Sequence, residues 1–248
     1  MTAGQAVRAG FRALKDAPLP SLGALAAAAL AVLAGAVATR AARGELERAI
    51  VEGEPVHAAS ALAIVLAGVT FAALLVEIAR AVALAAFGGS QHPFTDGLRR
   101  TPAMIAIAAV EWVVEGTLLG GALLALGRAS LHAIDLAHPA RAAAVATLCL
   151  APPLLLALAT FVAARIAMTL AARGLPPGAA LVHGYDTTLR RFPSLVRLAV
   201  RLLLMTLPLT ALAPFVPAPL AAVCAALATL WGYAALSAFV GPVDEEAR

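Results

Sequence analysis

Long runs of apolar residues recur along the whole chain, and they constrain its fold more than any other feature. Hydrophobic residues make up 62% of the 248 residues and charged residues only 13%, whereas a typical soluble domain is about 45–50% apolar and about 25% charged. Runs of about 18 or more apolar residues are typical of helices that cross a membrane. The sequence therefore predicts an all-α protein, a polytopic transmembrane helical bundle that forms a single integral membrane domain over residues 1–248.

The chain contains about six runs of sufficient length for a bilayer. They are residues 19–39, 59–87, 102–127, 141–172, 193–215 and 217–239. Backbone polar groups in lipid must be satisfied within their own segment, so each run is predicted to be a helix. The fourth run contains Pro152 and Pro153, which lack backbone donors and predict a kink or break there.

Arginine and lysine are distributed unevenly between the predicted loops. They gather at the N-terminus and in the loops before the third and fifth runs, whereas the opposite loops hold fewer. Because cytoplasmic loops are enriched in Arg and Lys, this pattern places both termini in the cytoplasm. The expected location is the inner (plasma) membrane, crossed several times, and the high Ala and Arg usage indicates a bacterial protein.

A short pattern occurs three times, each time directly before an apolar run. Residues 11–18, 94–102 and 185–193 each contain an aromatic residue, a leucine, basic residues and a final proline, about 84 and about 91 residues apart. The basic residues in these copies include Arg12, Lys15, Arg99, Arg100, Arg190 and Arg191. A recurring period defines an architectural unit, and we expect three units at about 5–87, 93–172 and 178–240.

The first copy has the pattern of a helix that lies in the membrane interface. Val7, Phe11 and Leu14 fall at i, i+4 and i+7, and Arg8 and Arg12 point away from them. An apolar face below and a basic face above suit the surface of an anionic leaflet. The predicted unit is thus a short cytoplasmic interfacial helix followed by a transmembrane hairpin, and its predicted partners are the bilayer and its anionic lipid head groups.

Residues 165–201, and residues 184–193 above all, resemble a group of bacterial polytopic membrane proteins. The group comprises the membrane domain found beside glycerophosphoryl diester phosphodiesterases and uncharacterised relatives of that domain. In these proteins a span is followed by a short amphipathic helix, a basic pair and the next span. The resemblance implies a fold, and no catalytic residue can be carried over.

Several ionisable residues fall inside the predicted spans, where a charge is costly and is a functional candidate by default. They are Glu77, Arg80, Glu111, Glu115, Arg165, Arg197 and Arg201. Most lie in the cytoplasmic half of their spans. They form either a polar cavity that binds an anionic head group or relays a proton, or a structural ion-pair cluster that fixes the register of the helices.

Spacing suggests how these charges pair. Glu111 and Glu115 are at i, i+4 and share a helix face, which makes Arg197 and Arg201 of the fifth run their predicted partners. Glu77 and Arg80 are at i, i+3 and are predicted to pair within one helix.

No catalytic residue can be named, and the sequence predicts neither a cofactor nor a metal site. His57, His132 and His138 fall in or near loops without ligand spacing, and no basic stripe interleaved with aromatics indicates nucleic-acid binding. The favoured function is a non-enzymatic protein that organises membrane lipid or binds a membrane-protein partner, including a second copy of itself. The alternatives are a transporter or lipid carrier that uses the charge cluster, and a membrane-embedded lipid-modifying enzyme with Glu111 and Glu115 as paired carboxylates.

Overall fold

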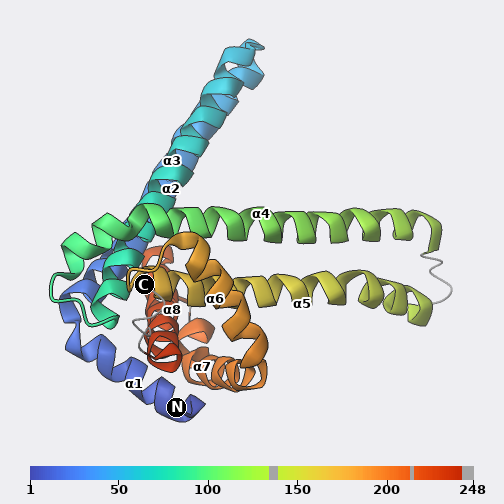
Figure 1. Ribbon diagram of the computed structural model, residues 1–248. Helices are drawn as coiled ribbons and strands as arrows, with labels where there is room; N and C mark the ends of the chain where they lie inside the picture. Colours follow the sequence, from blue (N-terminus) through green and yellow to red (C-terminus); the bar gives the residue numbers. More distant parts are fainter. Residues whose placement is uncertain (134–138, 213–214, 242–248) are drawn as a thin grey trace. The chain divides into compact units, whose positions relative to one another are not determined.

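The computed structural model describes residues 1–133, 139–212 and 215–241 (Figure 1). These residues form α-helices and the turns between them, and none of them lies in a β-strand. The helices are α1 (Ala3–Asp16), α2 (Pro18–Glu52), α3 (Pro55–Phe87), α4 (Pro93–Ala133), α5 (Pro139–Ala171), α6 (Pro177–Arg190), α7 (Phe192–Leu212) and α8 (Ala218–Val240). The predicted all-α class is confirmed.

Proline sets where many of these helices begin. The first residues of α2, α3, α4, α5 and α6 are Pro18, Pro55, Pro93, Pro139 and Pro177. Proline suits this position because the first backbone N–H of a helix has no partner within the helix and because its ring fixes a helical φ. The proline that marks each chain reversal in the sequence is therefore also the start signal of the next helix.

Among the residues that the structure describes, five helices are long and apolar enough to cross a membrane. They are α2, α3, residues Pro93–Gly127 of α4, residues Thr147–Ala171 of α5, and α8. The predicted run 193–215 corresponds to α7, and its last residues lie partly outside the described part of the chain. In α5 the helix continues through Pro152 and Pro153 and does not break there.

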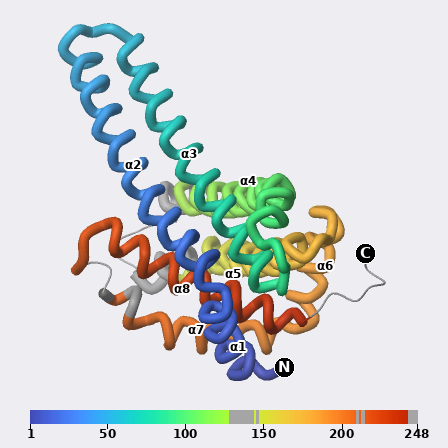
Figure 2. The backbone as a smooth tube through the Cα atoms, turned by 90° about the vertical axis from the view of Figure 1, so that its left-hand side faces the viewer, coloured from blue at the N-terminus to red at the C-terminus, as the bar shows by residue number. Residues whose placement is uncertain are grey.

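The chain divides into two compact units. The terminal unit contains Met1–Thr101 and Ser194–Pro242, and the central unit contains Pro102–Pro193. In the terminal unit, α2 and α3 run antiparallel as a long hairpin (Figures 1 and 2). The turn between them passes through Gly53, whose φ of 71° is left-handed and favours glycine.

The helix α8 holds the terminal unit together because it packs against α2 and α3 and also carries α1. Ala24 of α2, Ala83 of α3 and Leu230 of α8 form a small buried cluster where the three helices meet. In the central unit, α6 packs on α5. Alanine dominates these contacts, and small side chains let helix backbones approach closely in a membrane.

Three glycines allow a helix to approach the backbone of another helix directly. Gly10, Gly97 and Gly184 are equally spaced along the chain, and each lies in the short segment before a long apolar run. A Cβ atom at Gly10 would lie 2.6 Å from the backbone nitrogen of Ala235 in α8, and one at Gly97 would lie 2.5 Å from Cα of Val82 in α3. Gly184 meets the backbone of α5 in the same way. No side chain fits at any of these positions without a shift of the helices.

The same contact therefore recurs in each of the three predicted repeat units. In the second and third units the short segment packs on the long helix that directly precedes it in the chain. In the first unit no helix precedes α1 among the described residues, and α1 packs on the last helix, α8. The equal spacing of the glycines is a better measure of the period than the basic residues, which gave unequal intervals.

The second copy differs from the prediction in one respect. A separate short helix was expected before each run, and α1 and α6 are separate short helices, but residues 93–101 are continuous with the long helix α4. Pro102 lies inside α4 and ends no helix. The separate helix expected before the run 102–127 was therefore wrong, because a membrane-length helix tolerates the loss of one backbone hydrogen bond.

Replacing Gly184 with alanine tests the importance of the close approach. The new Cβ would lie 2.5 Å from the carbonyl oxygen of Ala163, and overpacking of this kind costs about 1–3 kcal/mol. Thermal unfolding of the detergent-purified protein should show a clear loss for Gly184→Ala. The matched control is Gly120→Ala on α4, where the added Cβ has nothing within 4 Å and alanine is the better helix former. Equal melting temperatures for the two variants would contradict the close-contact argument.

Candidate functional site

Arg80 and Glu77 form an ion pair on α3, as the i, i+3 spacing predicted. Nη1 of Arg80 lies 2.5 Å from Oε1 of Glu77, and the two side chains are 17% and 10% exposed. The guanidinium carbon of Arg80 also lies 5.4 Å from the ring centroid of Tyr233 in α8. A cation over an aromatic face is attracted by the ring quadrupole, so this contact links α3 to α8 through the charge.

A second arginine–glutamate pair lies in the central unit. Nη2 of Arg165 in α5 lies 2.5 Å from Oε1 of Glu111 in α4, and the side chains are 14% and 1% exposed. The same guanidinium lies over the ring of Phe161 at 4.4 Å from its centroid, and its Nη1 lies 3.4 Å from Sδ of Met168. This pair ties α4 to α5 within the central unit.

Glu111 pairs with Arg165, which the sequence did not suggest, because spacing along one helix shows which residues share a face but not which helix that face meets. Pairing of Glu111 and Glu115 with Arg197 and Arg201 would join the two units, and it stays a prediction. Within the terminal unit, Arg201 lies against α1, where its Nη1 takes the space that a side chain at Gly4 would need.

The other predicted site residues are at the surface or half-buried. Glu115 is half-buried and Arg197 is exposed. Among the interfacial basic residues, Arg190 pairs with Asp186 at 2.7 Å on α6, and Nζ of Lys15 lies 6.0 Å from the ring centroid of Phe11. The remaining interfacial residues are Arg12, Arg99, Arg100 and Arg191, all exposed or half-buried.

The glycine contacts relate the two arginines to each other. The residues that Gly97, Gly184 and Gly10 touch include Val82, Ala167 and Ala235. Two positions before these residues stand Arg80, Arg165 and Tyr233, respectively. These three side chains hence occupy equivalent positions in the three repeat units. In the terminal unit, the arginine of the first repeat lies over the tyrosine of the third.

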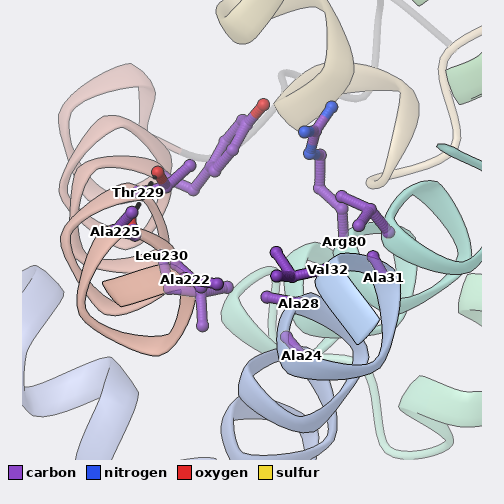
Figure 3. A pocket seen from close by; sticks show the side chains of 12 residues that line it. Ala24, Ala28, Ala31, Val32, Arg80, Ala222, Ala225, Thr229 and Leu230 are labelled. Carbon is purple, nitrogen blue, oxygen red and sulfur yellow. Dashed lines mark hydrogen bonds between the residues drawn. The ribbon is translucent and has the colours of Figure 1, made fainter. Parts of the chain in front are cut away.

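A cavity of about 310 Å³ lies in the terminal unit between α2, α3 and α8 (Figure 3). Much of its wall is alanine: Ala24, Ala28, Ala31, Ala222, Ala225 and Ala226. Arg80, Thr229 and Tyr233 supply its polar groups, and the Thr229 hydroxyl donates to the carbonyl of Ala225 at 2.8 Å. In Figure 3 the guanidinium of Arg80 lies at the opposite side of the cavity from Ala24. The cavity is therefore apolar along its walls and cationic and aromatic at one end.

A separate charged group occupies the turn between α2 and α3. Nδ1 of His57 lies 2.9 Å from Oε2 of Glu45, and its Nε2 lies 3.0 Å from Oε2 of Glu52 and 4.0 Å from Oε2 of Glu54. Glu52, Glu54 and His57 are close enough to share a metal ion, with ligand atoms within 4.8 Å of one another. Since the imidazole of His57 in α3 already contacts two carboxylates of α2, its evident role is to join α2 to α3 at their outer ends.

Known proteins give no further lead. No protein-family model, no curated protein and no solved structure matches this chain. The resemblance to the membrane domain of glycerophosphoryl diester phosphodiesterases therefore stays a prediction.

The sequence did not single out two parts of this site. In the sequence, nothing distinguishes Tyr233 from an ordinary core or membrane-interface residue. Its contact with Arg80 becomes evident only in the structure. The cavity is formed by alanines that are spread over two distant helices, and no local pattern marks them. The equal spacing of the three glycines was the one available signal, because it places Tyr233 in register with the two arginines.

Glu111→Gln should destabilise the protein strongly. Breaking a buried ion pair by removing one partner costs about 3–5 kcal/mol because the remaining charge is left uncompensated. The measurement is thermal unfolding in detergent, and the control is Asp186→Asn, whose exposed pair with Arg190 is worth about 0–1 kcal/mol. Replacing both charges with apolar residues, Glu111→Leu with Arg165→Met, should restore much of the loss. If Glu111→Gln melts no lower than Asp186→Asn, the pair does not support the fold.

Proposed function

We propose that this chain is a non-enzymatic, multi-pass membrane protein that organises membrane lipid by holding an acyl chain in the cavity between α2, α3 and α8. The observation that carries the proposal is the shape and chemistry of that cavity. Its alanine walls offer a narrow apolar slot within helices of membrane-spanning length, and Arg80 and Tyr233 stand at one end. An amphiphile has the matching arrangement of a long apolar chain and a single polar head.

The state of the acidic residues supports a non-enzymatic role. A carboxylate that acts as a general acid or base must exchange a proton with substrate. Glu77 and Glu111 each hold an arginine at 2.5 Å, so both carboxylates are already engaged in ion pairs. Glu111 is thus poorly suited to work with Glu115 as a catalytic pair, which weakens the lipid-modifying enzyme as an alternative.

A lipid carrier remains the second candidate, because one observation favours it. Arg80 is a charged side chain within a predicted span, and it lines a cavity, as charged residues on transport pathways do. A carrier differs from an organiser in moving its lipid between leaflets. A partner protein or a second copy of the chain would add to either function.

The proposed orientation places both termini in the cytoplasm of a bacterial cell and the α2–α3 turn outside the inner membrane. The helix α2 has 35 residues and is about 52 Å long, against about 30 Å of hydrocarbon, so its charged end extends beyond the membrane core.

Cysteine labelling of intact cells tests this orientation. In a background with Cys149 and Cys224 replaced by alanine, a membrane-impermeant maleimide should label Val51→Cys at the α2–α3 turn. It should label Thr2→Cys at the N-terminus only after the inner membrane is permeabilised. The reverse pattern would show the opposite orientation.

Filling the cavity tests the lipid-binding function. Ala28 lines the cavity, whereas Ala26 lies on the exposed face of the same helix. Native mass spectrometry of protein released from nanodiscs should show phospholipid bound to the wild type and to Ala26→Phe. Ala28→Phe should retain less than about half as much, because the phenyl ring occupies the slot. Equal lipid retention by both variants would rule out the cavity as the binding place.

A further inference from the structure

We infer that three arginines beside α1 form a specific site for the phosphate of an anionic phospholipid. They are Arg8 and Arg12 of α1 and Arg201 of α7. The inference rests on the proposed role in organising lipid. It adds a second lipid-binding site and a preference of that site for an anionic head group. It concerns a different surface from the α2–α3–α8 cavity, so the two can be tested apart.

The arginines follow one line along α1. Gly4, Arg8 and Arg12 stand at i, i+4 and i+8, which places them on one face of the helix. Arg201 reaches this face from α7, and its Nη1 lies against Gly4. The absence of a side chain at Gly4 is what admits the guanidinium. The next position on the same face is Asp16, which ends the basic row.

An open cavity of about 620 Å³ lies beside this row. It is lined by Val7, Arg8, Phe11, Arg12, Met205 and Trp231, so both α1 arginines border an apolar floor. No carboxylate lines this cavity in the part of the chain that the structure describes. Met205 is one helical turn beyond Arg201 on α7, so α7 contributes to the row and to the floor.

The floor is held in place by contacts between α1 and α8. Nε1 of Trp231 donates a hydrogen bond to the backbone carbonyl of Val7 at 3.0 Å. The rings of Phe11 and Trp231 pack with their centroids 5.7 Å apart, and Gly10 allows the two helices to touch. A surface fixed before binding loses little conformational entropy when a ligand arrives.

The chemistry of the cavity fits a phospholipid better than a free anion. Guanidinium groups bind phosphate oxygens through paired hydrogen bonds, and several arginines together favour a ligand with net negative charge over a zwitterion. The aromatic and thioether side chains of the floor would contact the glycerol and the first part of an acyl chain. A small inorganic anion would leave that apolar floor exposed.

The residue types around the cavity agree with a head group. Tryptophan and arginine both favour the boundary between hydrocarbon and head groups. The helix α1 is amphipathic, with Ala6, Val7 and Gly10 buried and Arg8 and Arg12 exposed, as an interfacial helix requires.

Quenching of Trp231 by brominated lipid tests the site directly. The full-length protein carries Trp112→Phe, so that Trp231 is the one remaining indole, and is reconstituted in nanodiscs of neutral phosphatidylcholine. Brominated phosphatidylglycerol, added as a minor component, should quench Trp231 at several times lower mole fraction than brominated phosphatidylcholine. Arg8→Gln with Arg12→Gln should reduce this preference roughly tenfold, because each basic residue contributes separately to binding an anionic lipid.

Three further variants complete the test. Arg201→Gln alone should weaken the preference, and Arg8→Lys with Arg12→Lys should keep part of it. The control Arg40→Gln with Arg43→Gln removes two exposed arginines from the other end of α2 and should change nothing. The melting temperature of each variant is measured as well. Only variants that melt like the wild type are compared, so that unfolding is not mistaken for lost binding.

Equal quenching by the two lipids in the wild type, or an unchanged preference in the Arg8/Arg12 variant, would overturn the inference. Loss of the preference in millimolar inorganic phosphate would also overturn it, since the site would then hold a small anion. Ala28→Phe separates the two proposals because it should lower lipid retention in the α2–α3–α8 cavity and leave the preference at Trp231 intact. Failure of one measurement therefore leaves the other interpretable.

Discussion

Helices in a bilayer must adhere without help from water, because lipid is as apolar as the side chains that face it. Close backbone contact then becomes the main source of adhesion between helices. Here it depends on three glycines, which have no side chain to keep the helices apart. Gly10, Gly97 and Gly184 each let a short basic segment touch the backbone of a long helix. The contact at Gly10 fixes where α1 meets α8, and so it fixes the floor of the arginine-lined cavity as well.

The charges within the spans have a related structural effect. Arg80 and Arg165 occupy equivalent repeat positions, and each meets one glutamate and one aromatic ring, from different neighbours in the two cases. Glu77 comes from the same helix as its arginine, whereas Glu111 comes from another helix. A guanidinium with a carboxylate and an aromatic face is tolerated in an apolar setting because its charge is compensated nearby. The arginine thus occupies the same position in the two repeats, whereas its glutamate and aromatic partners come from different neighbours.

The sequence predicted what depends on composition and on spacing within one helix. The long apolar runs gave the helices and most of their bounds, and the i, i+3 spacing gave the pair of Glu77 and Arg80. It could not give the partner of Glu111, because nothing local to α4 identifies α5 as its neighbour. The alanine-lined cavity could not be predicted for the same reason, because nothing local to α2 identifies α8 as its neighbour. Pro102 indicated the start of a new helix, but the residues on both sides of it belong to the single long helix α4.

The packing of α1 on α8 joins the first and the last of the described helices. During synthesis, α1 is complete long before its partner leaves the ribosome. Until then its apolar face has only the lipid surface to cover it, which suits a helix that can rest in the interface. Assembly of the terminal unit must therefore wait until α8 has been synthesised, and quality control acting on chains that lack α8 would meet α1 undocked.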